Sequence, residues 1–99
     1  MMMSKPMFNN KELKKLASLF KILSEPSRLK ILRSIFADEL CVSEIIKATG
    51  LLQANVSKQL KILLQSGIIK CKPVGLQRFY RVVDQDILLI CKQICKSKK

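Results

Sequence analysis

The chain contains no histidine and no tryptophan, and it has a single tyrosine. The absence of histidine removes the commonest general base and the commonest transition-metal ligand of proteins. The sequence also offers no glycine-rich phosphate loop and no Cys-x-x-Cys motif. We therefore expect a protein that is not an enzyme, with a cysteine-centred redox activity as the one catalytic alternative.

Long apolar runs are absent as well. No apolar stretch approaches the roughly 18 residues that a membrane helix needs, and the opening MMMSKPMFNN lacks the apolar segment of a secretory signal. With only 3 glycines and 3 prolines beside 48% hydrophobic residues, the chain is neither disordered nor of low complexity. These features predict one cytoplasmic domain spanning residues 1–99, with its four cysteines reduced at rest.

Acidic residues are missing from one long segment. The formal net charge is +12, and the 39 positions between Glu44 and Asp84 hold no acid at all. A surface of one sign favours a polyanionic partner. Two alternatives remain: a charge excess that only aids solubility, and a basic binder of any nucleic acid or anionic membrane, helped by a lysine-rich end. The cations of the acid-free segment are Lys47, Lys58, Lys61, Lys70, Lys72, Arg78 and Arg81, and the lysines of the end are Lys96, Lys98 and Lys99.

Helical periodicity marks three segments around this one. A first helix at about residues 10–25 follows the capping candidates Asn9 and Asn10, and a second begins at Pro26, a residue favoured in the first helical turn. A last helix covers about residues 84–96. We expect the first two helices to be core. The apolar stripes are Leu13, Leu16, Ala17, Phe20 and Leu23 in the first, Leu29, Leu32, Ile35 and Phe36 in the second, and Ile87, Leu88, Cys91, Ile94 and Cys95 in the last.

A helix-turn-helix is predicted at residues 43–66. Ser43 can cap a short helix that ends at Gly50, after an extended link at residues 40–42. The longer helix that follows, within LLQANVSKQLKILLQSG, buries a stripe of Val56, Leu60, Leu63 and Leu64. Residues 68–83 then alternate on both sides of Pro73, Val74 and Gly75, which predicts a β-hairpin wing. The expected fold is mainly α with a small β-hairpin, a winged helix-turn-helix.

The exposed face of the longer helix carries amides and lysines and no carboxylate. Such side chains suit the major groove of DNA, because Gln and Asn can pair with adenine while Lys reaches guanine or phosphate. The alternative is a solvated face that happens to lack acids. We expect base contacts from the N-terminal end, phosphate or rim positions for Gln59 and Lys61, and wing contacts from Lys72 and Arg78. The candidates for base contact are Gln53, Ala54, Asn55, Ser57 and Lys58.

Four blocks of sequence together resemble a winged helix-turn-helix repressor of the ArsR/SmtB type: EPSRLKIL, ELCVSEI, TGLLQANVSKQLKILLQSGII and RFYRV. The resemblance runs from about Leu16 to Val83. It implies a homodimeric transcriptional repressor that pairs through its first and last helices, binds an imperfect palindrome and leaves it when an effector arrives. The DNA-reading positions of the family fall on Gln53, Ala54, Ser57 and Lys58. Leu52 departs from the pattern, because the family often has a serine cap there.

A dimer is also expected on physical grounds. One helix in one groove makes few contacts, whereas two copies related by a two-fold axis can read two half-sites about 34 Å apart.

The effector that the resemblance implies would be sensed through cysteines. One family metal site uses a Cys-x-Cys pair, of which this chain keeps Cys41 alone, and another needs a histidine that is absent. Cys91 and Cys95, four residues apart on the last helix, remain candidates for a soft metal or metalloid or for reactive sulfur or oxidants. Cys41, just before a helix, is a weaker candidate if it is exposed, and Cys71 is expected to be structural. The alternative is an effector-independent regulator with purely structural cysteines and no cofactor.

Overall fold

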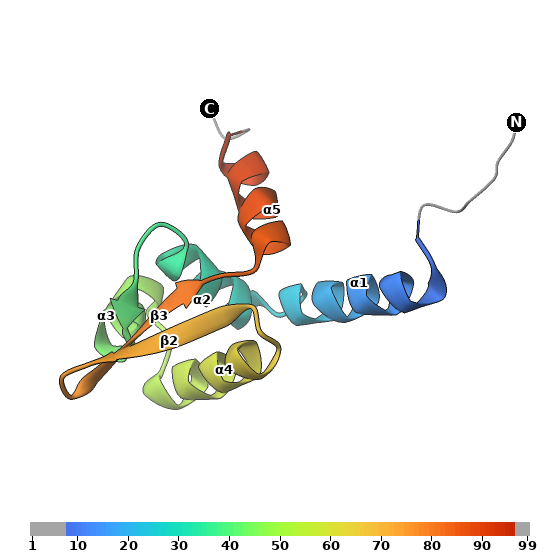
Figure 1. The fold of residues 1–99 in the computed structure, drawn as a ribbon. Helices are drawn as coiled ribbons and strands as arrows, with labels where there is room; N and C mark the ends of the chain where they lie inside the picture. Colours follow the sequence, from blue (N-terminus) through green and yellow to red (C-terminus); the bar gives the residue numbers. More distant parts are fainter. Residues whose placement is uncertain (1–7, 97–99) are drawn as a thin grey trace, which may run out of the picture.

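The structure is a computed structural model that describes residues 8–96, the last two of them as backbone only. Five helices and three short strands follow one another in the order drawn in Figure 1. Their bounds are α1 Asn10–Leu23, α2 Pro26–Ile35, β1 Leu40–Cys41, α3 Val42–Thr49, α4 Gln53–Gln65, β2 Ile69–Val74, β3 Gln77–Val82 and α5 Gln85–Lys96.

Side-chain caps set where most of the helices begin. The Asn9 side chain accepts from the Glu12 N–H at 2.8 Å and the Glu12 carboxylate accepts from the Asn9 N–H at 3.0 Å, which forms a capping box at α1. Glu25 caps α2 through the Arg28 N–H at 3.2 Å. Asp84 caps α5 through the Ile87 N–H at 3.0 Å.

The start of α3 differs from the sequence prediction. The N-cap is Cys41 and not Ser43, because Cys41 keeps an extended backbone and its N–H donates to the Glu44 carboxylate at 3.0 Å. Ser43 lies inside the helix. Gly50 ends α3 as predicted, in the left-handed conformation with φ of 74°, which favours glycine.

The wing belongs to a three-stranded antiparallel sheet with the order β1-β3-β2. Leu40 pairs with Tyr80 and Cys41 with Phe79, so the predicted link at residues 40–42 is partly a strand. The hairpin turn lies at Gly75 and Leu76, after a last pair of Val74 with Gln77. Pro73 is therefore inside β2 and not in the turn. It is tolerated there because β2 is an edge strand, where a missing N–H costs no ladder bond.

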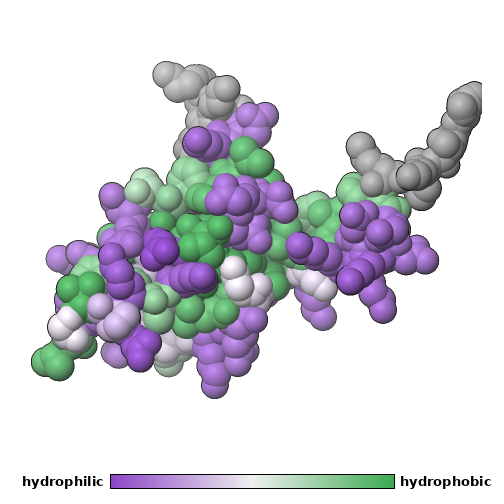
Figure 2. Space-filling view, viewed as in Figure 1, coloured by the Kyte–Doolittle hydropathy of each residue, from purple (hydrophilic) through white to green (hydrophobic). Residues whose placement is uncertain are grey.

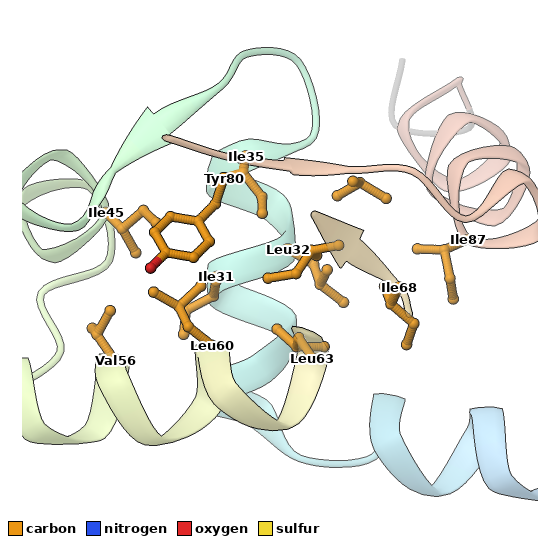
Figure 3. Packing of buried hydrophobic residues seen from close by; sticks show 12 residues of the cluster. Ile31, Leu32, Ile35, Ile45, Val56, Leu60, Leu63, Ile68, Tyr80 and Ile87 are labelled. Carbon is orange, nitrogen blue, oxygen red and sulfur yellow. The ribbon is translucent and has the colours of Figure 1, made fainter. Parts of the chain in front are cut away.

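The core lies between α2, α3, α4, the sheet and the start of α5 (Figure 3). The predicted stripe of α4 is confirmed, since Val56, Leu60 and Leu63 are buried and Leu64 is half-buried. The other buried members include Ile31, Leu32, Ile35, Ile45, Ile68, Ile69, Tyr80, Val82 and Ile87.

The prediction that the first helix is core is wrong for the single chain. No residue of α1 is buried, Phe20 is 57% exposed, and the helix extends away from the rest of the molecule in Figure 1. Its last turn still touches the core through Leu19, Ile22 and Leu23. In α2, Leu29 was predicted inward but is exposed, while Ile31 is fully buried. The outward face of α1 therefore lacks a partner within its own chain.

Candidate DNA-binding surface

The first turns of α4 present the predicted polar face to the outside. Gln53, Ala54, Ser57 and Lys58 are exposed, as is Lys61 one turn further on. The opposite side of α4 carries the buried stripe, so the helix is held from behind and open in front. Figure 2 shows hydrophilic side chains at the lower edge of the molecule, where Figure 1 places α4. This geometry permits the exposed face of α4 to enter the major groove of DNA.

Leu52 is the N-cap of α4 and makes no side-chain hydrogen bond to the first turn. Its own side chain is 80% exposed. The departure that the sequence suggested is therefore real: the helix begins without the polar cap that most helices have.

Gln59 does not lie on the exposed face, which corrects the sequence prediction. It is 5% exposed and is the one buried polar side chain among residues 8–94. Its oxygen accepts from Arg28 Nη1 at 3.0 Å and its amide nitrogen donates to Asn55 Oδ1 at 2.9 Å. Gln59 follows Val56 by three residues and precedes Leu63 by four, so helical spacing places it at the edge of the buried stripe. It has no access to a phosphate.

Asn55 is also partly engaged by the protein. It is half-buried, and its side-chain nitrogen donates to Ser27 Oγ at 3.1 Å. One donor and one acceptor site of the amide remain after the bonds to Ser27 and Gln59. Of the predicted base-contacting set, Asn55 is thus held at the side of α4 that faces α2, while the other four are exposed.

The cations of the wing differ in their surroundings. Lys72 Nζ lies 3.3 Å from Glu39 Oε1 and Arg81 Nη1 lies 3.7 Å from Glu39 Oε2, so one carboxylate serves both. Glu39 precedes the acid-free segment, which is why the sequence pattern gave no sign of this pairing. Arg78 is exposed and donates to the sulfur of Cys71 at 3.3 Å. Arg78 lies closest to the hairpin turn among these three cations.

The turn of the wing is apolar. Leu76 is fully exposed and Val74 is half-exposed, and Figure 2 shows hydrophobic atoms at this tip.

A cleft of about 450 Å³ separates the start of α3, the start of α4 and the wing. It brings Gln53 and Arg78, both predicted from the sequence, to the walls of one cavity. Ser43 and Gln77 line the same cleft and were missed, because they lie 34 residues apart in the chain and belong to no shared motif. Polar side chains on three sides of the cleft could contact the sugar–phosphate backbone of a nucleic acid that passes between α4 and the wing.

Tyr80 lies at the inner wall of this cleft. Burial raises the pKa of its hydroxyl above the usual value, negative charge on the neighbouring Cys71 sulfur raises it further, and the Arg78 guanidinium opposes both. The net shift favours the neutral phenol over the phenolate.

The three cysteines whose side chains the structure describes, Cys41, Cys71 and Cys91, belong to no group of ligands that could hold a metal ion. Cys41 is buried, with its sulfur 3.3 Å from Ser43 Oγ and accepting from Gln77 Nε2 at 3.9 Å, so it is not the exposed thiol that sensing would require. Cys91 is half-buried on α5, and the side chain of Cys95 lies outside the described residues. Among the described residues no group of three or more His, Cys, Asp or Glu side chains could hold a metal ion.

No helix in the part of the chain that the structure describes has the length and apolar character needed to cross a membrane. A helix-turn-helix of α3 and α4, followed by a β2–β3 hairpin, defines a winged helix-turn-helix domain. The homodimeric winged helix-turn-helix DNA-binding domain Mb0332 of Mycobacterium bovis has this fold, with a TM-score of 0.77 at 24% identity over 98% of this chain and 90% of that one.

Sequence comparisons place the domain in a family. A model described as bacterial regulatory protein, arsR family, matches residues 25–70. The HTH-type transcriptional regulator MJ1325 of Methanocaldococcus jannaschii is 35% identical over 81 residues, covering 81% of this chain and 91% of that protein. The chain belongs to the arsR family of bacterial regulatory proteins, as its resemblance implied. Its relatives are transcriptional regulators and not enzymes, which confirms that expectation.

This chain spans only about three-fifths of the length of another relative. The transcriptional repressor SmtB homolog of Synechocystis is 29% identical over 79 residues, which make up 80% of this chain and 60% of that repressor.

Proposed function

We propose that the chain is a sequence-specific, DNA-binding transcriptional repressor that acts as a homodimer on an imperfect palindrome. The observation that carries the proposal is the outer face of α4, where Gln53, Ser57, Lys58 and Lys61 are exposed and no carboxylate intervenes. Amides and hydroxyls can both donate to and accept from base edges, and lysines neutralise phosphates. A helix that only needed to be solvated would mix both signs of charge.

The residues divide into two roles in this proposal. Gln53, Ala54, Ser57 and Lys58 face the base edges because they occupy the first turns of α4, where recognition helices enter the groove. Asn55 contributes at the side of the helix with its remaining donor and acceptor. Lys61 and Arg78 contact phosphate, and Lys72 does so only by giving up part of its interaction with Glu39. Gln59 is excluded because it is buried.

The homodimer is supported by large apolar side chains that are exposed on the first and last helices. They are Leu13 and Phe20 of α1 and Leu89, Ile90 and Ile94 of α5. An apolar surface of this kind on a small domain marks an interaction site. A second copy of the chain is the occupant we propose, because a two-fold dimer also supplies the second recognition helix that a palindrome needs.

A selection experiment tests the proposed function. DNA that binds the protein is selected from random duplexes, and its affinity is compared with that of unrelated duplex. A repressor of this kind should prefer the selected sequence by roughly a thousandfold or more at physiological salt. Equal affinity for all duplexes, or equal binding to anionic vesicles, would show a nonspecific basic protein and contradict the proposal.

Two variants then separate the roles. Gln53→Ala should relax the base preference at one position of each half-site. Lys61→Ala should weaken binding to all sequences alike and lower the salt dependence by about one unit of slope. Lys14→Ala, an exposed lysine of α1, is the matched control and should change neither quantity. Equal losses on selected and random DNA in both α4 variants would refute these assignments.

We also propose that an effector releases the DNA through the thiols of α5. Cys91 packs beside the core near Ile87 and Leu88, and Cys95 follows it by one helical turn in the sequence. Because α5 belongs to the proposed dimer surface, a soft metal or metalloid bound by these thiols, or their reaction with an oxidant or reactive sulfur, would change how the two chains pack. The alternative is a regulator without an effector whose cysteines only pack.

The test measures operator binding under arsenite, peroxide and polysulfide. Wild type should lose affinity with at least one reagent, the Cys91→Ser, Cys95→Ser double variant should not respond, and Cys71→Ser should respond as wild type does. If wild type stays bound under every reagent, the alternative holds.

A further inference from the structure

A continuous chain of side-chain hydrogen bonds connects the end of α1 to the recognition helix. Arg28 Nε donates to the carbonyl oxygen of Ile22 in the last turn of α1 at 2.7 Å, and Arg28 Nη1 donates to Gln59 Oε1 at 3.0 Å. Gln59 Nε2 donates to Asn55 Oδ1 at 2.9 Å, and Asn55 Nδ2 donates to Ser27 Oγ at 3.1 Å. Because Ser27 directly precedes Arg28, the hydrogen bonds that leave α2 at Arg28 return to the first turn of α2 at Ser27.

Burial makes this connection specific. Gln59 is 5% exposed, and Arg28, Asn55 and Ser27 are half-buried. A buried amide that loses its partner retains the full cost of leaving water, so Gln59 and Arg28 hold each other in one arrangement. The arrangement fixes α4 at two successive turns, through Asn55 and through Gln59.

The contact between Arg28 and Ile22 lies beside the two-residue connection between α1 and α2, which sets the direction of α1. Only Ser24 and Glu25 separate α1 from α2. No residue of α1 is fully buried, and its contacts with the core come from its end, at Leu19, Ile22 and Leu23, so its direction depends on this connection to α2. Both linking residues are ordered by caps: the Ser24 hydroxyl donates to the carbonyl of Lys21 at 2.7 Å, and Glu25 caps α2. The Arg28 side chain connects the end of α1 to α4, because it donates to both Ile22 and Gln59.

We propose that Arg28 is a positioning residue for DNA recognition. By fastening the last turn of α1 to Gln59, it fixes the angle between the helix that meets the second chain and the helix that enters the groove. In a dimer this angle sets the separation of the two recognition helices, and hence the spacing of half-sites that the protein accepts. The inference rests on the proposed function, because it requires a homodimer on a palindrome.

A second connection, made by the main chain, holds the other end of α4. The carbonyl oxygen of Ile68, just after α4, accepts from the N–H groups of Val83 at 2.9 Å and Asp84 at 3.2 Å, directly before α5. Side-chain substitutions at Arg28 leave this connection in place. The variants below are therefore expected to keep α5 attached to the body and to remain dimers.

The test compares spacing preference and not affinity alone. The selected palindrome is lengthened or shortened by one base pair between its half-sites, which moves one half-site by about 3.4 Å and about a tenth of a turn. Wild type should lose roughly tenfold or more in affinity with either change, because several contacts are misplaced together. The double variant Arg28→Met, Gln59→Leu replaces both partners by apolar groups of similar size, and its loss should fall below about threefold.

Two controls keep a structural effect apart from a positioning effect. Arg33→Met removes an exposed arginine of the same helix and should behave as wild type. Arg28→Lys keeps the charge and the apolar stem but not the fork that reaches two acceptors at once, and it should also show a weakened spacing preference. Dichroism and sedimentation confirm that each variant is folded and dimeric, and Arg28→Lys decides the question if the double variant does not fold.

The outcomes are distinct. If no palindrome is selected, the proposed function fails. If wild type prefers one spacing and folded Arg28 variants prefer it equally strongly, Arg28 only satisfies a buried amide and the inference is overturned. It is likewise overturned if wild type accepts all three spacings equally.

Discussion

Tyr80 links the core, the wing and the cleft through one side chain. It is buried in β3, pairs with Leu40 of β1 and Cys71 of β2, and lines the cleft beside α4. Since it is the only tyrosine and the chain has no tryptophan, its ionisation can be followed without interference.

The titration of Tyr80 should affect stability at high pH. Burial and negative charge on the Cys71 sulfur raise its pKa in the folded state above the unfolded value of about 10. The folded state therefore holds the proton longer, so this contribution to stability is complete below pH 10 and is lost as the pH rises through the raised pKa. Phenolate absorbance should show a midpoint above 10, and Tyr80→Phe should remove the corresponding fall in unfolding free energy. A midpoint at or below 10 would contradict this.

Gln59 and Glu39 show why sequence reasoning located the polar site only in part. Gln59 sits at the edge of the α4 stripe, where spacing alone cannot tell a rim position from a buried one, and its burial depends on Arg28, which lies 31 positions earlier. Glu39 reaches Lys72 and Arg81 only because the strands bring them together. Partners distant in sequence leave no periodic signal.

Among the elements, α4 and the hairpin were predictable and the strand β1 was not. The α4 stripe repeats at helical spacing, and alternation marks β2 and β3. Strand β1 has only two residues, Leu40 and Cys41, which is too few for a pattern, and its existence depends on pairing with β3. The core prediction was wrong for α1 because an apolar stripe does not tell whether its partner lies in the same chain or, as in the proposed dimer, in a second copy.

The start of α4 offers a prediction about stability. Leu52→Ser would supply the missing cap, and because Leu52 is largely exposed the substitution loses little burial. We expect a gain of about 1 kcal/mol in the free energy of unfolding, measured by urea denaturation. Leu52→Ala is the control that removes the leucine without adding a cap, and it should show no such gain. Equal stability of the serine and alanine variants would exclude a capping effect.

Within its own chain, α1 is stabilised chiefly by its cap and its last turn. The capping box at Asn9 and Glu12 starts the helix, and contacts near Ile22 and Leu23 attach it to the core. The helix exposes Leu13 and Phe20, and in the proposed dimer a second copy of the chain covers this apolar face.

Phe20→Glu should therefore separate the dimer into monomers. The carboxylate would be buried without a partner in the proposed interface, which is strongly unfavourable. Sedimentation should show a monomer, and affinity for the selected palindrome should fall to roughly the level of random duplex. Ser18→Glu places the same charge on an exposed position of α1 nearly opposite Phe20 and should leave both quantities unchanged. A dimeric Phe20→Glu protein would contradict the proposed interface.

The pairing of Glu39 with Lys72 and Arg81 has a consequence for how electrolytes act on the protein. Two wing cations carry a fixed counter-charge before any polyanion approaches. Each of them neutralises a phosphate less completely than an unaccompanied lysine would, so fewer condensed ions leave the nucleic acid when the wing arrives. Counting all 19 lysines and arginines as phosphate-neutralising groups would therefore overstate how steeply rising ionic strength loosens the complex.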